Sequence, residues 1–267
     1  DPYLDTVGGG ERYAMTVAEA LLKKNWQVDI FWQNKEIKEN LMKKFSLDID
    51  RVNFVSYSPR VNNLFNRHKK EKEYDFLFYF SDGSVPFMFG RKNVLHFQVP
   101  FKNVLDGKWN KFKLLTIDYI VCNSEFTKKT IIHIANDKIK VVYPPIDIDK
   151  FLPKTKENII LSVGRFSQLL QSKKQDVLVE AFKSADKKKI KGWKLIFAGG
   201  AEVGGKEFLE KLKKEAVNFP IEIIENPPFQ KLSELYSRAK IFWVASGYEV
   251  DEEINPEKVE HFGMTTV

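Results

Sequence analysis

The sequence predicts an α/β fold built from two doubly wound domains. Three observations lead to this prediction. Short apolar runs alternate with helical patterns, these runs are continuously apolar, and the alternation restarts after a proline-rich segment near the middle of the chain. Continuously apolar strands are typical of parallel sheets that helices cover on both faces. Strands that alternate with helices also favour parallel sheets built from strand–helix–strand units.

The first half of the chain opens with a helix and continues with short strands. Apolar residues recur at helical spacing from Ala14 to Leu22, which predicts a helix that begins near Glu11. Runs rich in Val, Ile and aromatic residues then predict strands, because such side chains fit a buried pleated surface. These runs are Gln27–Trp32, Val52–Ser56, Phe76–Phe80, Val94–Gln98 and Ile120–Asn123. Ser124 is suited to cap the helix that follows.

The same alternation restarts at Asn158. The predicted strands of the second half are Ile159–Val163, Lys194–Ala198, Ile221–Ile224 and Ile241–Ala245. The predicted helices between them are Asp176–Ser184, Phe208–Val217 and Leu232–Ala239. Between the halves, Pro144 and Pro145 bias the backbone to extended conformations and interrupt helix and sheet. We therefore expect one domain over residues 1–145 and another over residues 146–267.

Both ends of this pattern are expected to be incomplete. Gly8, Gly9 and Gly10 open the first helix, and the few residues before them leave little room for a strand. The first strand of the N-terminal domain is therefore expected to be missing. The C-terminal pattern stops after its fourth strand, which predicts an incomplete second domain.

Composition restricts the class of protein. The 267 residues exceed the usual size of one domain, and a hydrophobic fraction of 43% can form two cores. No apolar run is long enough to span a bilayer and no signal peptide opens the chain, which favours a cytoplasmic protein. The single cysteine, Cys122, fits a reducing compartment, and its apolar neighbours predict a buried side chain.

The net charge of +7 is compatible with nucleic acid, an anionic membrane surface or phosphorylated ligands as partners. No motif interleaves aromatic residues with the lysines, so nucleic acid is not expected. A solvated lysine-rich surface is the simplest interpretation of the remaining charge. The acidic stretch from Glu249 to Glu253 fits no calcium-loop spacing, so no metal is expected there.

Two glycine-rich turns are candidates for ligand contact. Gly8, Gly9 and Gly10 precede a helix, whose N-terminal N–H groups can bind an anion that glycine allows to approach closely. Gly199 and Gly200 follow the predicted strand Lys194–Ala198. The first turn lacks the spaced glycines of a dinucleotide fingerprint, and no acid is placed for a ribose. A Rossmann dehydrogenase is therefore disfavoured.

Four charged or titratable residues are candidates for chemistry. Arg165 and Lys173 follow the first strand of the second domain, and two fixed cations there can offset the charge of a leaving diphosphate. Spacing alone does not separate Lys173 from Lys174, and both can equally be solvated loop residues. His96 ends a strand and is expected at the edge of a cleft, although its residues alone favour a structural role. Glu260 precedes Gly263, which permits close approach of backbone N–H groups to a ligand.

Taken together, these segments resemble the retaining glycosyltransferases of the GT-B fold, family 4. The segments are Gly8–Arg12, Val94–Pro100, Asn123–Thr127, Gly164–Lys173 and Glu260–Val267. In that family a Glu, seven further residues and a second Glu line the nucleotide-sugar site. Glu260 matches the first Glu, and the second would follow Val267. The resemblance implies two Rossmann-like domains that face a cleft, with acceptor-side residues in 1–145 and the donor site in 146–267.

The resemblance also implies roles for individual residues. Arg165 and Lys173 would stabilise the departing diphosphate, while Glu260 and His96 would position the sugar ring. The other implied donor-site residues are Gly199, Gly200, Phe229, Phe262, Gly263, Met264 and Thr265, with Gly8, Gly9 and Gly10 facing donor and acceptor.

The implied activity is a metal-independent hexosyl transfer with retention of configuration. The donor would be GDP-mannose or a UDP-sugar, and the acceptor a hydroxyl of a carbohydrate or a lipid-linked glycan. No cofactor is implied beyond the donor substrate, and peripheral attachment at the cytoplasmic membrane face is compatible with the charge. Two alternatives stay open. One is another GT-B enzyme, such as a phosphorylase or an epimerase, and the other is a non-catalytic sugar-nucleotide-binding or scaffold chain.

Overall fold

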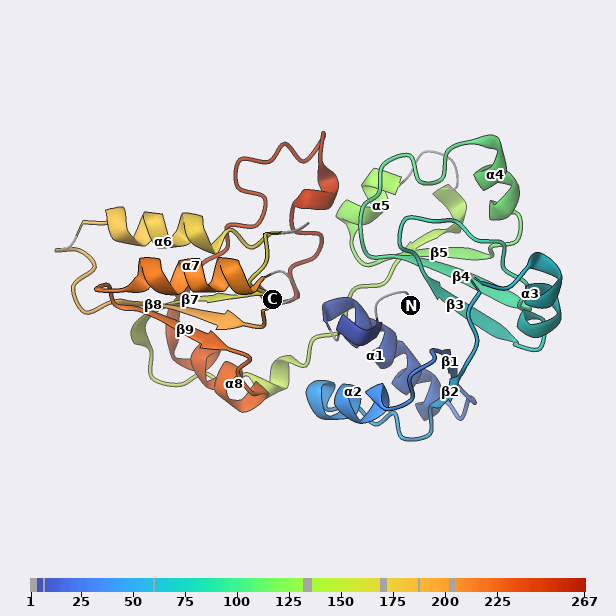
Figure 1. Cartoon of the computed structure of the whole chain (residues 1–267), viewed down its shortest axis with the longest axis horizontal. Helices are drawn as coiled ribbons and strands as arrows, with labels where there is room; N and C mark the ends of the chain where they lie inside the picture. Colours follow the sequence, from blue (N-terminus) through green and yellow to red (C-terminus); the bar gives the residue numbers. More distant parts are fainter. Residues whose placement is uncertain are drawn as a thin grey trace. The chain divides into compact units, whose positions relative to one another are not determined.

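The chain divides into two compact units (Figure 1). The computed structural model describes residues 4–6, 8–59, 61–131, 136–168, 172–186, 188–201 and 205–267. Asp1–Pro145 form the N-terminal unit and Ile146–Val267 form the C-terminal unit. The boundary lies at the adjacent prolines, whose missing N–H groups and fixed φ angles end regular pairing. Both units contain parallel sheets with helices, which confirms the predicted α/β class.

The C-terminal unit contains a four-stranded parallel sheet in the order β10-β7-β8-β9. Its strands are β7 (Glu157–Val163), β8 (Lys194–Gly199), β9 (Ile221–Glu225) and β10 (Ala239–Phe242). Its helices are α6 (Gln175–Ser184), α7 (Lys206–Ala216) and α8 (Phe229–Arg238), with the short 3-10 helices η3 (Ile148–Lys150) and η4 (Pro256–Lys258).

Helices cover both faces of this sheet. Successive residues of a strand point to opposite faces. Ile160 and Phe197 accordingly pack in one core with α6 and α7, whereas Leu161 and Ile196 pack in another with Leu235 of α8. Figure 1 shows α6 and α7 on one side of the strands and α8 on the other. This two-sided burial explains why the strands are apolar without alternation.

The N-terminal unit contains two parallel sheets. The first pairs β1 (Asp29–Phe31) with β2 (Asn53–Val55), and the second has the order β3-β4-β5-β6. The strands of the second sheet are β3 (Phe76–Phe80), β4 (Lys92–Phe97), β5 (Tyr119–Cys122) and β6 (Ile139–Val141). The helices are α1 (Gly9–Lys23), α2 (Ile37–Phe45), α3 (Leu64–Glu71), α4 (Lys108–Leu114) and α5 (Glu125–Ile131), with η1 (Leu4–Thr6) and η2 (Asn136–Lys138).

Two hydrophobic cores stabilise the N-terminal unit. One lies on the face of the four-stranded sheet that includes Leu95, Phe97 and Cys122, and Cys122 is buried as predicted. The other joins α1 and α2 to the two-stranded sheet, with Met15 and Phe54 among its members. The Ser124 hydroxyl accepts a hydrogen bond from the Thr127 N–H at 3.0 Å, which confirms the predicted cap of α5.

Several element boundaries differ from the prediction. The predicted strand Ile241–Ala245 is β10 over Ala239–Phe242, because Ala239 already pairs with Glu157. Helices α2, α3 and α4 lie in segments for which the sequence predicted no element. Their exposed faces are rich in lysine, so apolar periodicity is weak there. Among the described residues, no helix combines the length and apolar character needed to cross a membrane.

Candidate functional site

The C-terminal unit brings two strand ends into close contact at glycines. The Gly164 N–H donates to the Ala198 carbonyl at 3.0 Å, and the Phe166 N–H donates to the Gly200 carbonyl at 2.9 Å. A Cβ atom on Gly199 would lie 2.0 Å from the Gly164 carbonyl oxygen. Only glycine therefore fits at position 199, and the two turns form one rigid platform at the carboxyl ends of β7 and β8.

Arg165 and Lys173 both lie on the loop that leaves this platform. The Arg165 side chain is exposed, and its carbonyl accepts a hydrogen bond of 2.9 Å from Gln175 Nε2. Gln175 is 1% exposed and begins α6, so it ties the loop to the helix. A Cβ atom on Gly164 would lie 2.6 Å from Lys173 Cγ. The missing side chain at Gly164 thus leaves room for the Lys173 stem.

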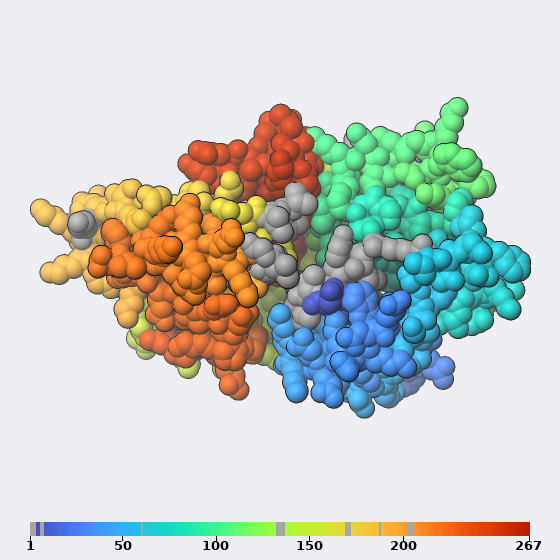
Figure 2. Space-filling view, in the orientation of Figure 1, coloured from blue at the N-terminus to red at the C-terminus, as the bar shows by residue number. Residues whose placement is uncertain are grey.

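Lys173 and Glu260 form an ion pair that joins two predicted site residues. Lys173 Nζ lies 2.5 Å from Glu260 Oε2, and the side chains are 17% and 28% exposed. The space-filling view shows the red surface of the C-terminal segment adjoining the yellow surface that precedes α6 (Figure 2). Lys174 instead caps α6 in a left-handed conformation with φ 51°. Of the two lysines, Lys173 is the one whose ammonium meets the acid.

A tight turn follows Glu260. Gly263 has φ +79°, a conformation that favours glycine. Its carbonyl accepts hydrogen bonds from the Thr266 N–H at 2.8 Å and from the Thr266 hydroxyl at 2.6 Å. The Tyr236 hydroxyl donates to the Thr265 carbonyl at 2.7 Å, which fixes the turn to α8. Phe262, Met264 and Thr265 are half-buried along this turn.

Phe229 and the second glycine turn are linked through the segment before α8. Phe229 is the first residue of α8, and its ring lies 5.6 Å from that of Phe151. Asn226, just before the helix, donates its N–H to the Gly199 carbonyl at 2.7 Å. The turn at Gly199 and Gly200 therefore lies beside the start of α8.

In the N-terminal unit, the glycine loop lies at the carboxyl end of β4. The Gly8 N–H donates to Glu11 Oε2 at 2.6 Å, so the Glu11 carboxylate caps the start of α1. The Gly10 carbonyl accepts from Gln98 Nε2 at 3.4 Å, and Gln98 directly follows β4. Asn123 donates through Nδ2 to the Gln98 carbonyl at 3.1 Å, which links this position to the end of β5.

His96 is inaccessible, so the expectation that it lies at the edge of a cleft is wrong. Its side chain is 0% exposed and stacks on Tyr13 with ring centroids 4.5 Å apart. Its position in β4 points it to the sheet face that α1 covers. Neither ring nitrogen has a hydrogen-bond partner of normal geometry among the described residues. Burial lowers the pKa of His96 to about 3, so the ring is neutral at physiological pH.

Several residues that support the site were missed by sequence reasoning. Gln175, Asn226 and Tyr236 each hold a site turn in place through a hydrogen bond. Of these three residues, only Gln175 had a signal that could have identified it, because it is a polar residue at a helix position that is buried. Residues 249 and 251–253 of the acidic stretch are exposed, and the described part of the chain holds no cluster of potential metal ligands.

Two units, each with a parallel sheet and a glycine turn at the carboxyl ends of its strands, form the α/β architecture expected of the GT-B class. A family model described as Glycosyltransferase Family 4 matches residues 7–150, and one described as Glycosyl transferases group 1 matches residues 145–267. The chain belongs to this family of glycosyltransferases.

One curated relative is a GDP-Man:Man(3)GlcNAc(2)-PP-Dol alpha-1,2-mannosyltransferase from Xenopus laevis. It is 32% identical over 141 residues, which cover 46% of this chain and 28% of the relative. The chain thus matches less than a third of that relative's length.

Solved structures show weaker similarity. UDP-GlcNAc 2-epimerase from Neisseria meningitidis bound to UDP-GlcNAc is 12% identical, with a TM-score of 0.48 over 88% of this chain and 74% of that one. TarM is 14% identical, with a TM-score of 0.46 over 76% of this chain and 48% of that one. Identities and TM-scores this low do not indicate a shared activity.

Proposed function

We propose that this protein transfers a hexose from a nucleoside-diphosphate-sugar to a hydroxyl acceptor with retention of configuration. Family membership supports sugar transfer. The observation that carries the proposal is the Lys173–Glu260 pair, 2.5 Å apart, beside the Gly164–Gly199 platform. This ion pair joins the loop of Arg165 and Lys173, which is suited to bind a diphosphate, to the segment of Glu260, which is suited to bind a sugar.

Each residue has a stated role in this proposal. Arg165 and Lys173 bind the diphosphate, whose negative charge grows as the bond from the anomeric carbon to the diphosphate oxygen breaks. Lys173 then shares its ammonium between Glu260 and the diphosphate. Glu260 accepts hydrogen bonds from sugar hydroxyls, and backbone N–H groups from Gly263 to Thr265 face the donor. These two side-chain cations make the reaction metal-independent in our proposal.

The glycine-rich turns and Phe229 complete the donor site. Gly199 and Gly200 allow the nucleotide to approach the backbone, and Phe229 lies beside the base. The acceptor oxygen forms its bond to the anomeric carbon on the face that the diphosphate leaves. Its proton passes to an oxygen of the departing diphosphate, so no protein nucleophile is required. Gly8, Gly9 and Gly10 contact the acceptor side, while buried His96 is a positioning residue that supports α1.

GDP-mannose is our first candidate donor, because the curated relative named above is GDP-mannose-dependent, and UDP-sugars are the second. The acceptor class we propose is a carbohydrate or lipid-linked glycan. The net charge of +7 supports peripheral binding at an anionic cytoplasmic membrane surface.

Saturation-transfer NMR with GDP-, UDP- and ADP-sugars tests the donor site. We expect one nucleotide to bind selectively to the wild type and at least tenfold more weakly to Arg165→Ala, because the mutant loses a cation at the diphosphate. Arg91→Ala, an exposed arginine of the N-terminal unit, is the matched control and should bind as the wild type does. Absence of binding by the folded wild type would overturn the proposal, and equal binding by Arg165→Ala would remove Arg165 from it.

A further inference from the structure

A cluster of aromatic rings connects the segment from Ile146 to Lys154 with the candidate donor site of the C-terminal unit. At its centre is Phe151, which directly follows η3. The Phe151 ring lies 5.6 Å from that of Phe229 and 5.3 Å from that of Tyr236, both in edge-to-face geometry. Tyr236 in turn stacks on Phe242 of β10, with ring centroids 5.4 Å apart. Edge-to-face and stacked pairs at such distances stabilise a fixed arrangement of the rings.

Hydrogen bonds on both sides of Phe151 hold this segment to α8. The Ser233 hydroxyl donates to the Lys150 carbonyl at 2.7 Å. The Lys154 N–H donates to the Ser237 carbonyl at 3.2 Å. The backbone that carries the Phe151 ring is thus fixed to the helix just before and shortly after that residue.

Phe229, the first partner of Phe151, opens α8 beside the glycine turn of β8. The Asn226 N–H, three residues before Phe229, donates to the Gly199 carbonyl at 2.7 Å. Lys150 Nζ lies 5.9 Å from the centroid of the Phe229 ring, within range of a cation–π contact. Phe151 and Lys150 therefore hold the ring that the proposed function places beside the base.

Tyr236, the second partner, holds the turn that follows Glu260. Its hydroxyl donates to the Thr265 carbonyl at 2.7 Å. Burial raises the pKa of Tyr236 above its ordinary value, so the hydroxyl keeps the proton that this hydrogen bond requires. The rings of Phe151 and Phe242 pack against Tyr236 and restrict the direction in which its hydroxyl points.

We propose that Phe151 is a positioning residue for the donor site, which sets the base side and the sugar side relative to each other. It acts through Phe229 on the base side and through Tyr236 on the turn from Gly263 to Thr265. Its role rests on the proposed function, which places the base beside Phe229 and the donor against that turn. Phe151 carries no charge and no polar side-chain atom, so its effect on the donor is geometric.

Hydrogen exchange tests the support of both turns without any ligand. In Phe151→Leu, we expect the amides of Asn226 and Thr266 to exchange at least tenfold faster than in the wild type. Each of these amides donates to a backbone carbonyl in a turn that the Phe151 ring supports. In Tyr236→Phe, only the Thr266 amide should exchange faster, because Phe229 keeps its contact with Phe151. Amides of β8 should exchange as in the wild type in both variants.

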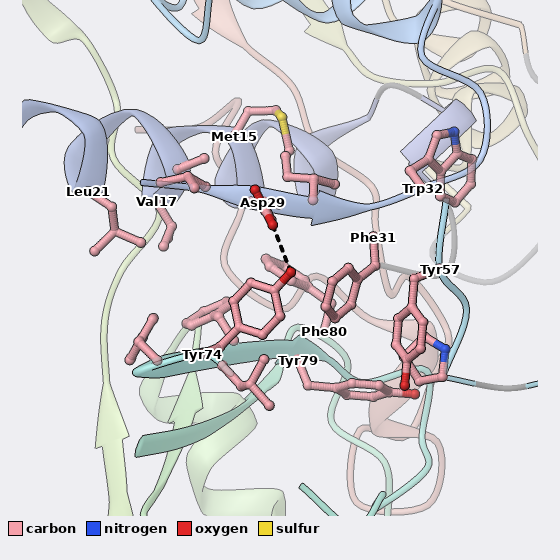
Figure 3. Close-up of a pocket in the computed structure, with 18 of the residues that line it drawn as sticks. Met15, Val17, Leu21, Asp29, Phe31, Trp32, Tyr57, Tyr74, Tyr79 and Phe80 are labelled. Atoms are coloured by element: carbon pink, nitrogen blue, oxygen red, sulfur yellow. Dashed lines mark hydrogen bonds between the residues drawn. The ribbon is translucent and has the colours of Figure 1, made fainter. Parts of the chain in front are cut away.

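Two control variants remove similar groups elsewhere. Tyr74→Phe removes a hydroxyl that donates to Asp29 Oδ2 at 2.7 Å, beside a cavity of about 460 Å³ in the N-terminal unit (Figure 3). None of the residues that line this cavity belongs to the candidate donor site. Phe219→Leu removes a partly exposed ring of the C-terminal unit. In both controls the Asn226 and Thr266 amides should exchange as in the wild type.

Saturation-transfer NMR then measures donor binding. We expect Phe151→Leu to bind the nucleotide-sugar that the wild type selects at least tenfold more weakly, and the two controls to bind it as the wild type does.

Three results would overturn the role of Phe151 while the proposed function stands. One is unchanged exchange of Asn226 and Thr266 in Phe151→Leu. Another is equal acceleration of the β8 amides, which would indicate a general loss of stability. The third is unchanged nucleotide-sugar binding by Phe151→Leu. Absence of nucleotide-sugar binding by the folded wild type would instead overturn the proposed function, and the role of Phe151 with it.

Discussion

At the scale of single residues, the Lys173–Glu260 pair and His96 differ in whether an opposite charge lies beside the buried group. Lys173 and Glu260 are half-buried and form an ion pair, with Nζ and Oε2 2.5 Å apart. His96 has no such partner in the described structure and lies among Tyr13, Phe78 and Phe80. Burial without a counter-charge favours the neutral ring, which explains the lowered pKa. The histidine therefore contributes to packing and to the pH dependence of stability.

We predict that stability falls with acidification through His96. The unfolded chain binds a proton near the ordinary histidine pKa of about 6.5, whereas the folded chain resists protonation down to about 3. The stabilisation is thus complete above pH 6.5 and is lost as pH falls, by about 1.4 kcal/mol per unit. Between pH 7.5 and 5, urea unfolding should show a loss of about 2 kcal/mol that is absent from His96→Phe. If the free energy of unfolding changed equally with pH in the wild type and in His96→Phe, this would contradict a buried neutral histidine.

At the scale of elements, the contact between the ends of β7 and β8 organises the candidate donor site. Gly199 meets the backbone of Gly164, while Gly164 meets only the flexible side chain of Lys173. The β7 turn, the β8 turn and the loop to α6 are therefore held in one arrangement by backbone contact. A backbone neighbour cannot rotate away as a side chain can, so this contact tolerates no added atom.

We predict a large difference between two neighbouring glycine substitutions. Gly199→Ala would place a Cβ atom 2.0 Å from a carbonyl oxygen, whereas Gly200→Ala would meet only the side-chain oxygen of Asn226 at 2.9 Å. We expect Gly199→Ala to lower the free energy of unfolding of the C-terminal unit by about 3 kcal/mol, and Gly200→Ala by about 1 kcal/mol or less. Urea unfolding followed by circular dichroism measures both. Similar losses in the two variants would argue against the close backbone approach.

At the scale of the whole molecule, the chain consists of two units with separate sheets and separate cores. The segment that joins them contains adjacent prolines and exposed apolar side chains. Val142, Tyr143, Ile148 and Leu152 are between 49% and 69% exposed. Exposed segments that connect compact units are preferred sites of proteolysis.

Limited digestion with thermolysin should therefore cut first between residues 142 and 152. We expect two products, one for each unit, that resist further digestion because each retains its own core. Mass spectrometry of the early products identifies the first cut. Early cuts inside β4 or β7, before any cut in the joining segment, would contradict two independently stable units.

The sequence by itself determined the α/β class, the order of the main strands and helices, the proline-rich boundary segment and the family. These depend on periodicity and on short motifs, which neighbouring residues carry without help from the rest of the chain. The tertiary structure decided which lysine meets Glu260 and that His96 is buried. Lys173 and Glu260 are 87 positions apart, and the burial of His96 depends on which face of β4 α1 covers. Such facts follow from strand pairing and packing between distant segments, which no local pattern contains.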